Sequence, residues 1–155
     1  MPGRRLPGGG IDGGYVRPPS VVSAMVSYGS DLYVGTGLGW NSCNVFRMSG
    51  GGWVKAAEPS FGNLDDFEVS SLAVYAGGLY AGTTNRATGA NMYRYNGTSW
   101  ATVGTQGFGD GANTGFCSMY SAAPQEMDYI YVGTTNEATG CHVWQYVSGT
   151  GNLLT

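Results

Sequence analysis

Short runs of β-branched and aromatic residues, broken every few positions by glycine or asparagine, recur from about residue 21 onward. The clearest example lies mid-chain, where the pattern predicts four strands, at 70–75, 79–84, 91–95 and 100–103. The hairpin turns between them carry Gly77-Gly78 and Asn96-Gly97. Such dipeptides supply the positive φ that tight turns need, so we expect a four-stranded antiparallel meander.

The same pattern occurs three times along the chain. LYVGT at 32–36 is followed 47 residues later by LYAGT at 79–83, and IYVGT stands at 130–134, a further 51 residues on. The longer second spacing reflects an insertion of four residues near 123–129. Rare residues keep the register, since Trp53 aligns with Trp100 and Phe61 with Phe108. The three copies span about 22–68, 69–115 and 116–155.

A recurring four-stranded meander of about 40–50 residues is typical of a β-propeller blade. The chain resembles bacterial β-propeller repeat proteins, whose blades carry Leu-Tyr-Val/Ala-Gly-Thr, then Asn, Thr-Gly, an aromatic-Arg-Tyr strand and a Trp strand. In the second copy these are 79–83, Asn85, Thr88-Gly89, 93–95 and Trp100. The resemblance covers about 21–155 and implies a fold but no activity. The first copy departs from it at 37–42, and the third has Gly151 in place of the Trp. A solenoid of two-stranded repeats is the alternative.

Three blades are too few to close a propeller, which typically has 4–8. An open arrangement leaves sheet faces and edges exposed. A two-fold homodimer would complete a six-bladed ring, with each chain as one half. We therefore expect an all-β fold of three four-stranded blades per chain, with a second copy of the chain as partner. The alternative, a propeller fragment of a longer protein, is compatible with self-association.

The first 20 residues differ from the rest of the chain. They contain four of the 6 prolines, three of the seven basic residues and six glycines. We interpret 1–20 as a flexible Gly/Pro/Arg arm and 21–155 as the propeller segment. No apolar stretch follows Arg4-Arg5, as a secretory signal requires, and no run approaches the ~18 apolar residues of a membrane-spanning helix. The cellular compartment stays open.

Composition and charge narrow the class of partner. Charged residues make up 11% of the chain, against about 25% in an average domain. Lys55 is the only lysine, and the net charge is -3. Nucleic acids are recognised by basic patches, so no nucleic acid is expected as a partner.

One end of each predicted blade carries longer, more polar loops than the other. The second-to-third strand connections and the crossovers between blades share this end. Since binding residues concentrate on loops held by a rigid scaffold, we expect a ligand, either a glycan or a protein, to bind there. The candidates are Trp40, Asn41, Asn85, Arg86, Asn136 and Glu137 in the connections, and Asp65, Asp66, Asp110 and Asn113 in the crossovers. Each Asn or Asp could instead form an Asx-turn.

Metal and cysteine chemistry have weaker support. Calcium is possible at the crossovers, 61–66 and 108–113, although neither has the spacing of a known calcium loop. Cys43 and Cys141 occupy equivalent positions in two blades, too far apart for a disulfide, so they and Cys117 are expected to be small buried thiols. His142 adjoins Cys141 on a strand, where neighbours point to opposite faces and cannot form a catalytic pair.

The recurring aromatic positions, including Tyr33, Tyr80 and Tyr131, are interpreted as packing between sheets, whereas Trp40 in its loop is the better platform for a sugar. Two function classes follow. The first is a non-enzymatic binding or interaction module, which we favour; the second is a hydrolase or lyase with its site in the propeller channel. The inner strands offer almost no acids or bases apart from Glu68, so we assign no catalytic residue and no metal ligand.

Overall fold

A computed structural model describes residues 6, 19–38, 42–122, 129–147 and 153–154. Throughout these residues the protein is all-β, with twelve strands paired antiparallel and two short 3-10 turns but no α-helix. The described part contains no helix with the length and apolar character needed to cross a membrane. The predicted all-β antiparallel class is thus confirmed. The predicted arm, 1–20, lies almost entirely outside the described residues.

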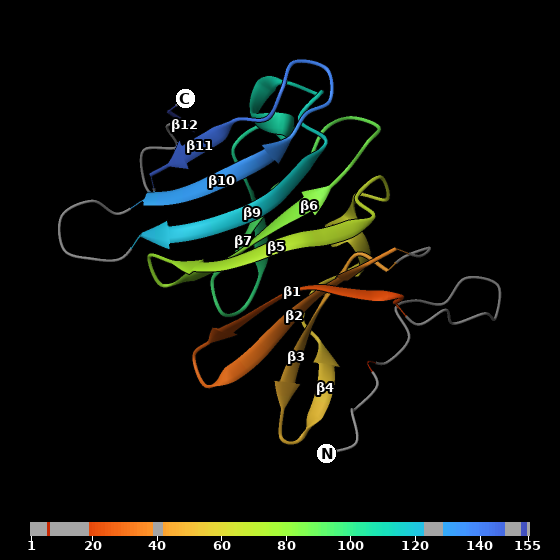
Figure 1. Ribbon diagram of the computed structural model, residues 1–155. Coiled ribbons are helices and arrows are strands. Elements are labelled where there is room, and N and C mark those ends of the chain that lie inside the picture. The colour runs from red at the N-terminus through yellow and green to blue at the C-terminus, as the bar shows by residue number, and fades with distance from the viewer. Residues whose placement is uncertain (1–5, 7–18, 39–41, 123–128, 148–152, 155) are drawn as a thin grey trace.

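The strands form three meanders of four strands each, which succeed one another along the chain (Figure 1). The first meander contains β1 (Val21–Tyr28), β2 (Asp31–Gly37), β3 (Asn44–Ser49) and β4 (Gly52–Lys55). The second contains β5 (Glu68–Tyr75), β6 (Gly78–Thr84), β7 (Met92–Tyr95) and β8 (Trp100–Val103). The third contains β9 (Gly115–Ala122), β10 (Tyr129–Thr135), β11 (Val143–Tyr146) and β12 (Leu153–Leu154). Within the second meander, no strand boundary differs from its predicted position by more than two residues.

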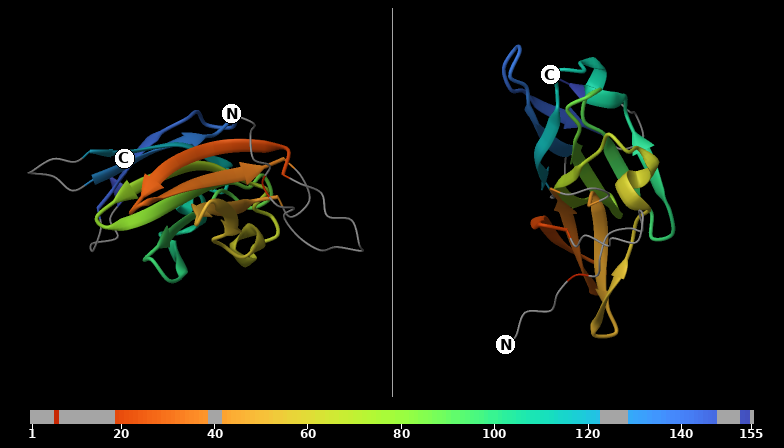
Figure 2. Two further views of the ribbon diagram at one scale, coloured as in Figure 1. Left: turned by 90° about the horizontal axis from the view of Figure 1, so that it is seen from below. Right: turned by 90° about the vertical axis from the view of Figure 1, so that its right-hand side faces the viewer.

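Neighbouring meanders meet along their first strands. β1, β5 and β9 lie side by side, and one antiparallel residue pair joins each meander to the next, Gly37 with Glu68 and Thr84 with Gly115. Serine hydroxyls reinforce these joints: Ser23 Oγ donates to the Val69 carbonyl at 2.6 Å, and Ser71 Oγ donates to the Phe116 carbonyl at 2.6 Å. The right-hand view of Figure 2 shows the three meanders in succession. The strands do not close into a ring.

The glycine of the Leu-Tyr-X-Gly-Thr motif lets the next meander approach closely. A Cβ on Gly35 would lie 2.6 Å from Val69 Cγ1, and a Cβ on Gly82 would lie 2.8 Å from both Phe116 Cβ and Met119 Cε. Both contacts cross from one meander to the next. A methyl group at either position would therefore push the first strand of the following meander off the second strand of the preceding one.

Two hydrophobic cores lie in the two interfaces between meanders. The first core contains Val45 and Tyr33 from the first meander and Val69 and Leu79 from the second. The second core contains Tyr80 and Met92 from the second meander and Phe116 and Ile130 from the third. The second meander is therefore covered on both faces, whereas the described residues cover the first and third meanders on one face each.

The two crossovers between meanders share an unusual backbone course. Each contains a 3-10 turn, η1 (Pro59–Gly62) and η2 (Gln106–Gly109), with a phenylalanine in the left-handed region: Phe61 has φ 51° and Phe108 has φ 55°. Ring stacking holds both residues there, because Phe61 lies 4.2 Å from Tyr93 and Phe108 lies 4.1 Å from Phe116, centroid to centroid. The sequence pattern gave no sign of these turns.

Candidate functional site

We call the end of the molecule that carries the crossovers and the second-to-third strand connections the loop end. There, one buried carboxylate joins the crossover between the first two meanders to the connection between β6 and β7. Asp66 is fully buried and accepts hydrogen bonds from four side chains. The donors are Thr83 Oγ1 at 3.1 Å, Asn85 Nδ2 at 3.0 Å, Asn91 Nδ2 at 3.0 Å and Tyr93 OH at 2.8 Å. Burial raises the pKa of Asp66, and these four hydrogen bonds partly offset the rise.

The third meander repeats this arrangement with different residues. Asn136 Nδ2 donates to Asn113 Oδ1 at 3.0 Å and to Asp110 Oδ2 at 3.1 Å. Asn113 Nδ2 donates in turn to the Gly107 carbonyl at 2.8 Å. A neutral Asn113 thus replaces the carboxylate of Asp66, and Trp144 stands where Tyr93 would supply its hydroxyl.

Four of the predicted binding residues are therefore internal to the fold. Asp66, Asn85, Asn113 and Asn136 are buried. Asn85 Oδ1 also accepts from the backbone N–H groups of Ala87 and Thr88 at 3.1 and 3.0 Å, and Asn136 forms the same Asx-turn. Asn85 and Asn136 thus form the Asx-turns that were the alternative to a binding role, whereas Asn113 bonds to Asn136 and to the Gly107 carbonyl.

The exposed candidates lie on the surface of this end. Arg86 and Glu137 come from successive meanders and line one small cavity of 290 Å³ with Ala112, Thr114 and Ala138. The Arg86 guanidinium lies over the Phe67 ring, 5.5 Å from its centroid. Asp65 is exposed and Asp110 is half-buried. Trp40 and Asn41 lie outside the described residues.

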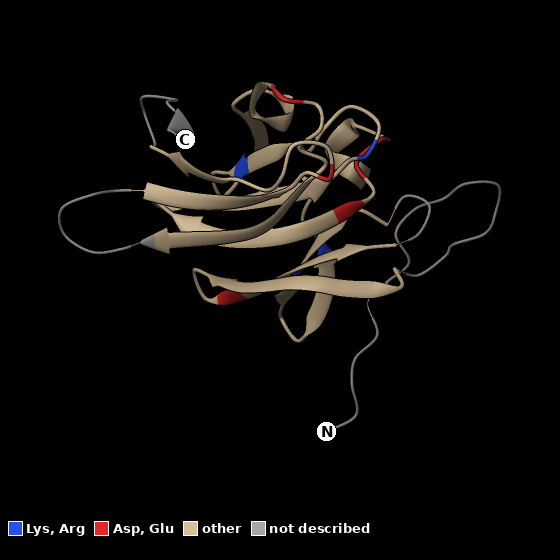
Figure 3. Cartoon of the chain, turned by 45° about the horizontal axis from the view of Figure 1, so that its top comes forward, with Lys and Arg blue, Asp and Glu red and all other residues tan. Residues whose placement is uncertain are grey.

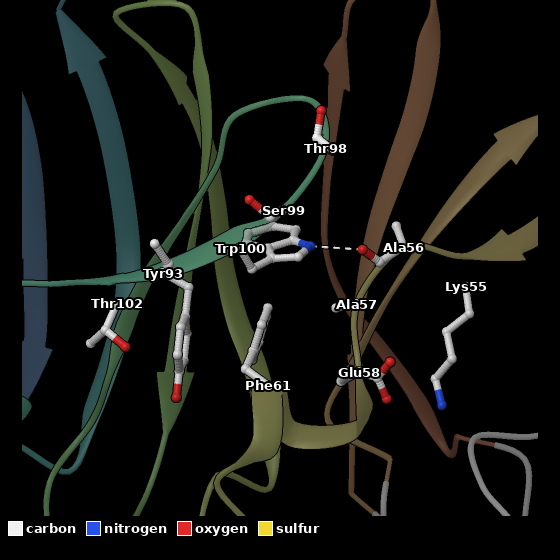
Figure 4. Close-up of a pocket in the computed structure, with 11 residues that line it drawn as sticks. Lys55, Ala56, Ala57, Glu58, Phe61, Tyr93, Thr98, Ser99, Trp100 and Thr102 are labelled. Carbon is white, nitrogen blue, oxygen red and sulfur yellow. Dashed lines mark hydrogen bonds between the residues drawn. The ribbon is translucent and has the colours of Figure 1, made fainter.

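A larger groove of 600 Å³ lies between the first two meanders, away from the predicted residues. One wall is the segment that follows β4, and the other is β8 with the turn before it. Figure 4 shows Trp100 and Phe61 in the middle, Glu58 and Lys55 to one side and Tyr93 and Thr102 to the other. The full lining is Lys55, Ala56, Ala57, Glu58, Phe61, Tyr93, Thr98, Ser99, Trp100, Ala101 and Thr102.

The aromatic side chains of the groove are held rigidly. Trp100 Nε1 donates to the Ala56 carbonyl at 2.7 Å, which joins the two walls. Phe61 stacks on Tyr93 with an interplanar angle of 13° and meets Trp100 edge-on at 5.0 Å. The Tyr93 hydroxyl is bound to Asp66, so Tyr93 presents a ring to the groove and no free hydroxyl. Burial, together with the Asp66 charge, strongly raises the pKa of Tyr93.

Two side chains of opposite charge lie together on one side of Phe61 and Trp100. Lys55 and Glu58 are both exposed. Partial burial of the ammonium lowers the pKa of Lys55, and the neighbouring Glu58 carboxylate acts in the opposite direction. Charged side chains are sparse on the strands of this protein, as Figure 3 shows.

The sequence pattern does not predict this groove. Trp100 and Phe61 served only as markers of the repeating pattern, since nothing in the sequence shows that β8 faces the segment after β4 of the preceding meander. One signal was available, because Lys55 is the only lysine of the chain and Glu58 lies three residues away.

The expectation of three buried thiols is wrong for two of the cysteines. Cys43 is fully buried, but Cys117 and Cys141 are exposed, because no described residues pack over that face of the third meander. None of the three forms a disulfide.

Glu68, the acidic residue of the inner strands, pairs with Gly37 where the first two meanders meet, and Thr84 Oγ1 lies 3.5 Å from its carboxylate. In the described ranges no three His, Cys, Asp or Glu side chains gather as a metal site.

Comparison of this chain with models of protein families, with curated proteins and with solved structures finds no match. The function must therefore be argued from the geometry above.

Proposed function

We propose that this chain is a non-enzymatic binding or interaction module, built of three β-propeller blades that pair with a second copy to complete a six-bladed ring. The supporting observation is the exposure of apolar side chains on the outer faces of the first and third meanders. Both carry apolar side chains at the positions that form the cores between meanders, yet no described part of the chain covers them.

The outer face of the first meander matches a buried face of the second. Val22, Met25 and Leu32 are 45%, 66% and 37% exposed. The residues 47 positions later, Val69, Leu72 and Leu79, are 0%, 9% and 0% exposed and belong to the first core. The first meander thus presents the surface with which the second meander contacts its predecessor.

The outer face of the third meander matches the opposite face of the second. Tyr120 and Val143 are 68% and 66% exposed, whereas their counterparts Ala73 and Met92 are 5% and 1% exposed in the second core. Cys141 is exposed, and its counterparts Cys43 and Ala90 are buried. The third meander therefore presents the surface with which the second contacts its successor.

These two faces complement each other because the chain already joins such faces twice. A second copy would place its first meander against the third meander of the first copy, and the reverse contact would close the ring.

The molar mass in solution tests the proposal. We expect light scattering at micromolar concentration to give the mass of two chains. Met25→Asp and Tyr120→Asp should each yield a folded monomer, because a carboxylate cannot be buried unpaired in the new interface. The matched control is Leu64→Asp, which changes an apolar side chain that is 78% exposed on the crossover and should leave the dimer intact.

A monomeric wild-type chain would overturn the proposal. An open-ended polymer would also overturn it, since six blades close only when two copies meet at both faces. Equal loss of the dimer in the Leu64→Asp control would show that the association does not use the outer faces.

A further inference from the structure

We propose that the groove between the first two meanders binds the pyranose ring of a neutral sugar. This inference rests on the proposed binding function and deepens it by naming the site and the class of ligand. The groove lies within one chain, so it is complete whether or not a second copy is present.

The aromatic residues supply a wall for the apolar face of a sugar ring. A pyranose has C–H groups on its faces and hydroxyl groups around its edge, so it fits sites that combine rings with a few polar groups. Phe61 and Trp100 line the groove, and both are only partly buried. Because Tyr93 supports Phe61 and the Ala56 carbonyl anchors Trp100, the wall is formed before any ligand arrives.

The polar residues are suited to hydroxyl groups. The two oxygens of Glu58 can each accept a hydrogen bond from neighbouring hydroxyls, and the Lys55 ammonium can donate to a hydroxyl oxygen. Thr98, Ser99 and Thr102 add hydroxyls on the opposite wall. Since the two charges are of opposite sign, the groove favours a ligand without net charge.

The interface between the second and third meanders has different residues at the positions equivalent to those of the groove. Phe108 occupies the position of Phe61 there, but it stacks on Phe116 and is tilted against Trp144, the counterpart of Tyr93. The charged residues have no counterpart, because Thr102 and Thr105 stand at the positions of Lys55 and Glu58. The second interface forms its core with threonines at these two positions. Lys55 and Glu58 beside Phe61 and Trp100 are therefore particular to the first groove, which is where we place the ligand.

The size of the groove favours a compact ligand over a protein partner. Its volume, 600 Å³, lies within the range of small-molecule sites, roughly 300–1,000 Å³. A stable protein interface covers about 800 Å² on each partner, which is more than these few residues offer.

The test is an NMR titration of the full chain with methyl β-D-glucopyranoside, methyl β-D-galactopyranoside, methyl α-D-mannopyranoside and N-acetyl-D-glucosamine. We expect at least one probe to shift the Trp100 indole N–H signal saturably at up to about 50 mM, a range suited to millimolar dissociation constants. Lys55→Met and Glu58→Gln should each weaken that binding about tenfold, because each removes a charge-assisted hydrogen bond. Thr105→Ala, at the counterpart of Glu58, is the matched control and should bind as the wild type does.

Absence of any saturable shift at Trp100, or variants that bind as tightly as the wild type, would overturn the inference. A response confined to signals around Arg86 and Glu137 would place the sugar at the loop end instead and would equally overturn it. If short peptides shift the Trp100 signal and the sugars do not, the groove takes peptides and the assignment is wrong. The molar mass of the same samples reports dimer formation separately, so failure of one proposal is not mistaken for failure of the other.

Discussion

At the scale of single residues, Asp66 shows how one buried charge can organise a loop. Its carboxylate accepts hydrogen bonds from four side chains, but no described cation forms an ion pair with it. Neutral donors satisfy the oxygen lone pairs without fully replacing the hydration of a charge, which is why burial dominates and the pKa is raised. Asp66 thus fixes the loop through its hydrogen bonds, but its carboxylate would be better solvated in water than in the protein interior.

The pH dependence of the unfolding free energy of Asp66→Asn, compared with the wild type, tests whether burial raises the pKa of Asp66. A raised pKa means that the folded state holds the proton more tightly than the unfolded chain. The stabilising contribution of Asp66 is therefore fully present below its unfolded pKa, near 3.8, and is lost as the pH rises through the folded value. We expect the free energy of unfolding of the wild type, relative to Asp66→Asn, to increase as the pH falls from 7 toward 4. Urea unfolding followed by tryptophan fluorescence measures this difference.

The control is Asp65→Asn, the same chemical change on the exposed neighbouring side chain. If the unfolding free energies of the wild type and Asp66→Asn ran parallel with pH, or if the difference changed in the opposite direction, burial would not be the dominant influence on this carboxylate.

At the scale of strands, the second strand of each of the first two meanders packs closely against the following meander. A side chain on Gly35 or Gly82 would collide with that neighbour, and the threonine after each glycine binds the connection to the third strand. Thr83 Oγ1, for example, accepts from the Asn91 backbone N–H at 2.9 Å. The conformation of Gly82 does not itself require glycine, since its φ is not positive, so a substitution there reports on space alone.

Gly82→Ala should destabilise the fold by about 1–3 kcal/mol, the usual cost of overpacking, because the added methyl group meets Ser71, Phe116 and Met119. Gly133→Ala is the informative comparison. The new methyl group would meet Ser118 of its own meander, whose side chain is exposed and can move. Thermal unfolding at low concentration should therefore show a smaller loss for Gly133→Ala, and an equal loss would contradict the role assigned to the next meander.

The strands and turns of the second meander were predictable because their patterns are local. Alternating side chains, Asn-Gly turns and the repeating motif fixed the four strands to within two residues. The environment of each side chain was not predictable in the same way. Cys117 and Cys141 look like core residues by alignment with the second meander, and only the missing neighbour exposes them. The groove escaped notice for a related reason, since its two walls lie about 40 positions apart in sequence and meet only when the meanders pack.

At the scale of the whole molecule, the two outer faces make a directional prediction. Met25→Asp damages only the first face and Tyr120→Asp damages only the last, so each variant alone has a damaged residue in every head-to-tail contact. Mixed together, they retain one intact contact, between the third meander of the Met25→Asp chain and the first meander of the Tyr120→Asp chain.

We therefore expect two monomeric variants to form a heterodimer on mixing, with weaker affinity than the wild-type dimer because only one of two contacts is intact. Light scattering of the mixture against each variant alone measures this. A mixture that stays monomeric would exclude the head-to-tail arrangement, because the intact contact between the two variants would then have failed to form.

The unequal cover of the three meanders also bears on how the molecule opens. Amide hydrogens exchange with solvent when local structure opens, and segments that bury the most apolar surface open least often. β5 and β6 lie in the middle meander, between both cores, so their amides are expected to report the global unfolding of the chain. β1 and β9 each have a face that no described residues cover. The protection of their amides from exchange should therefore depend on how often a second copy is bound. The strands with the slowest amide exchange and those whose exchange depends most on protein concentration would then lie side by side. Their packing neighbours, more than their own sequences, would set the difference in exchange rate.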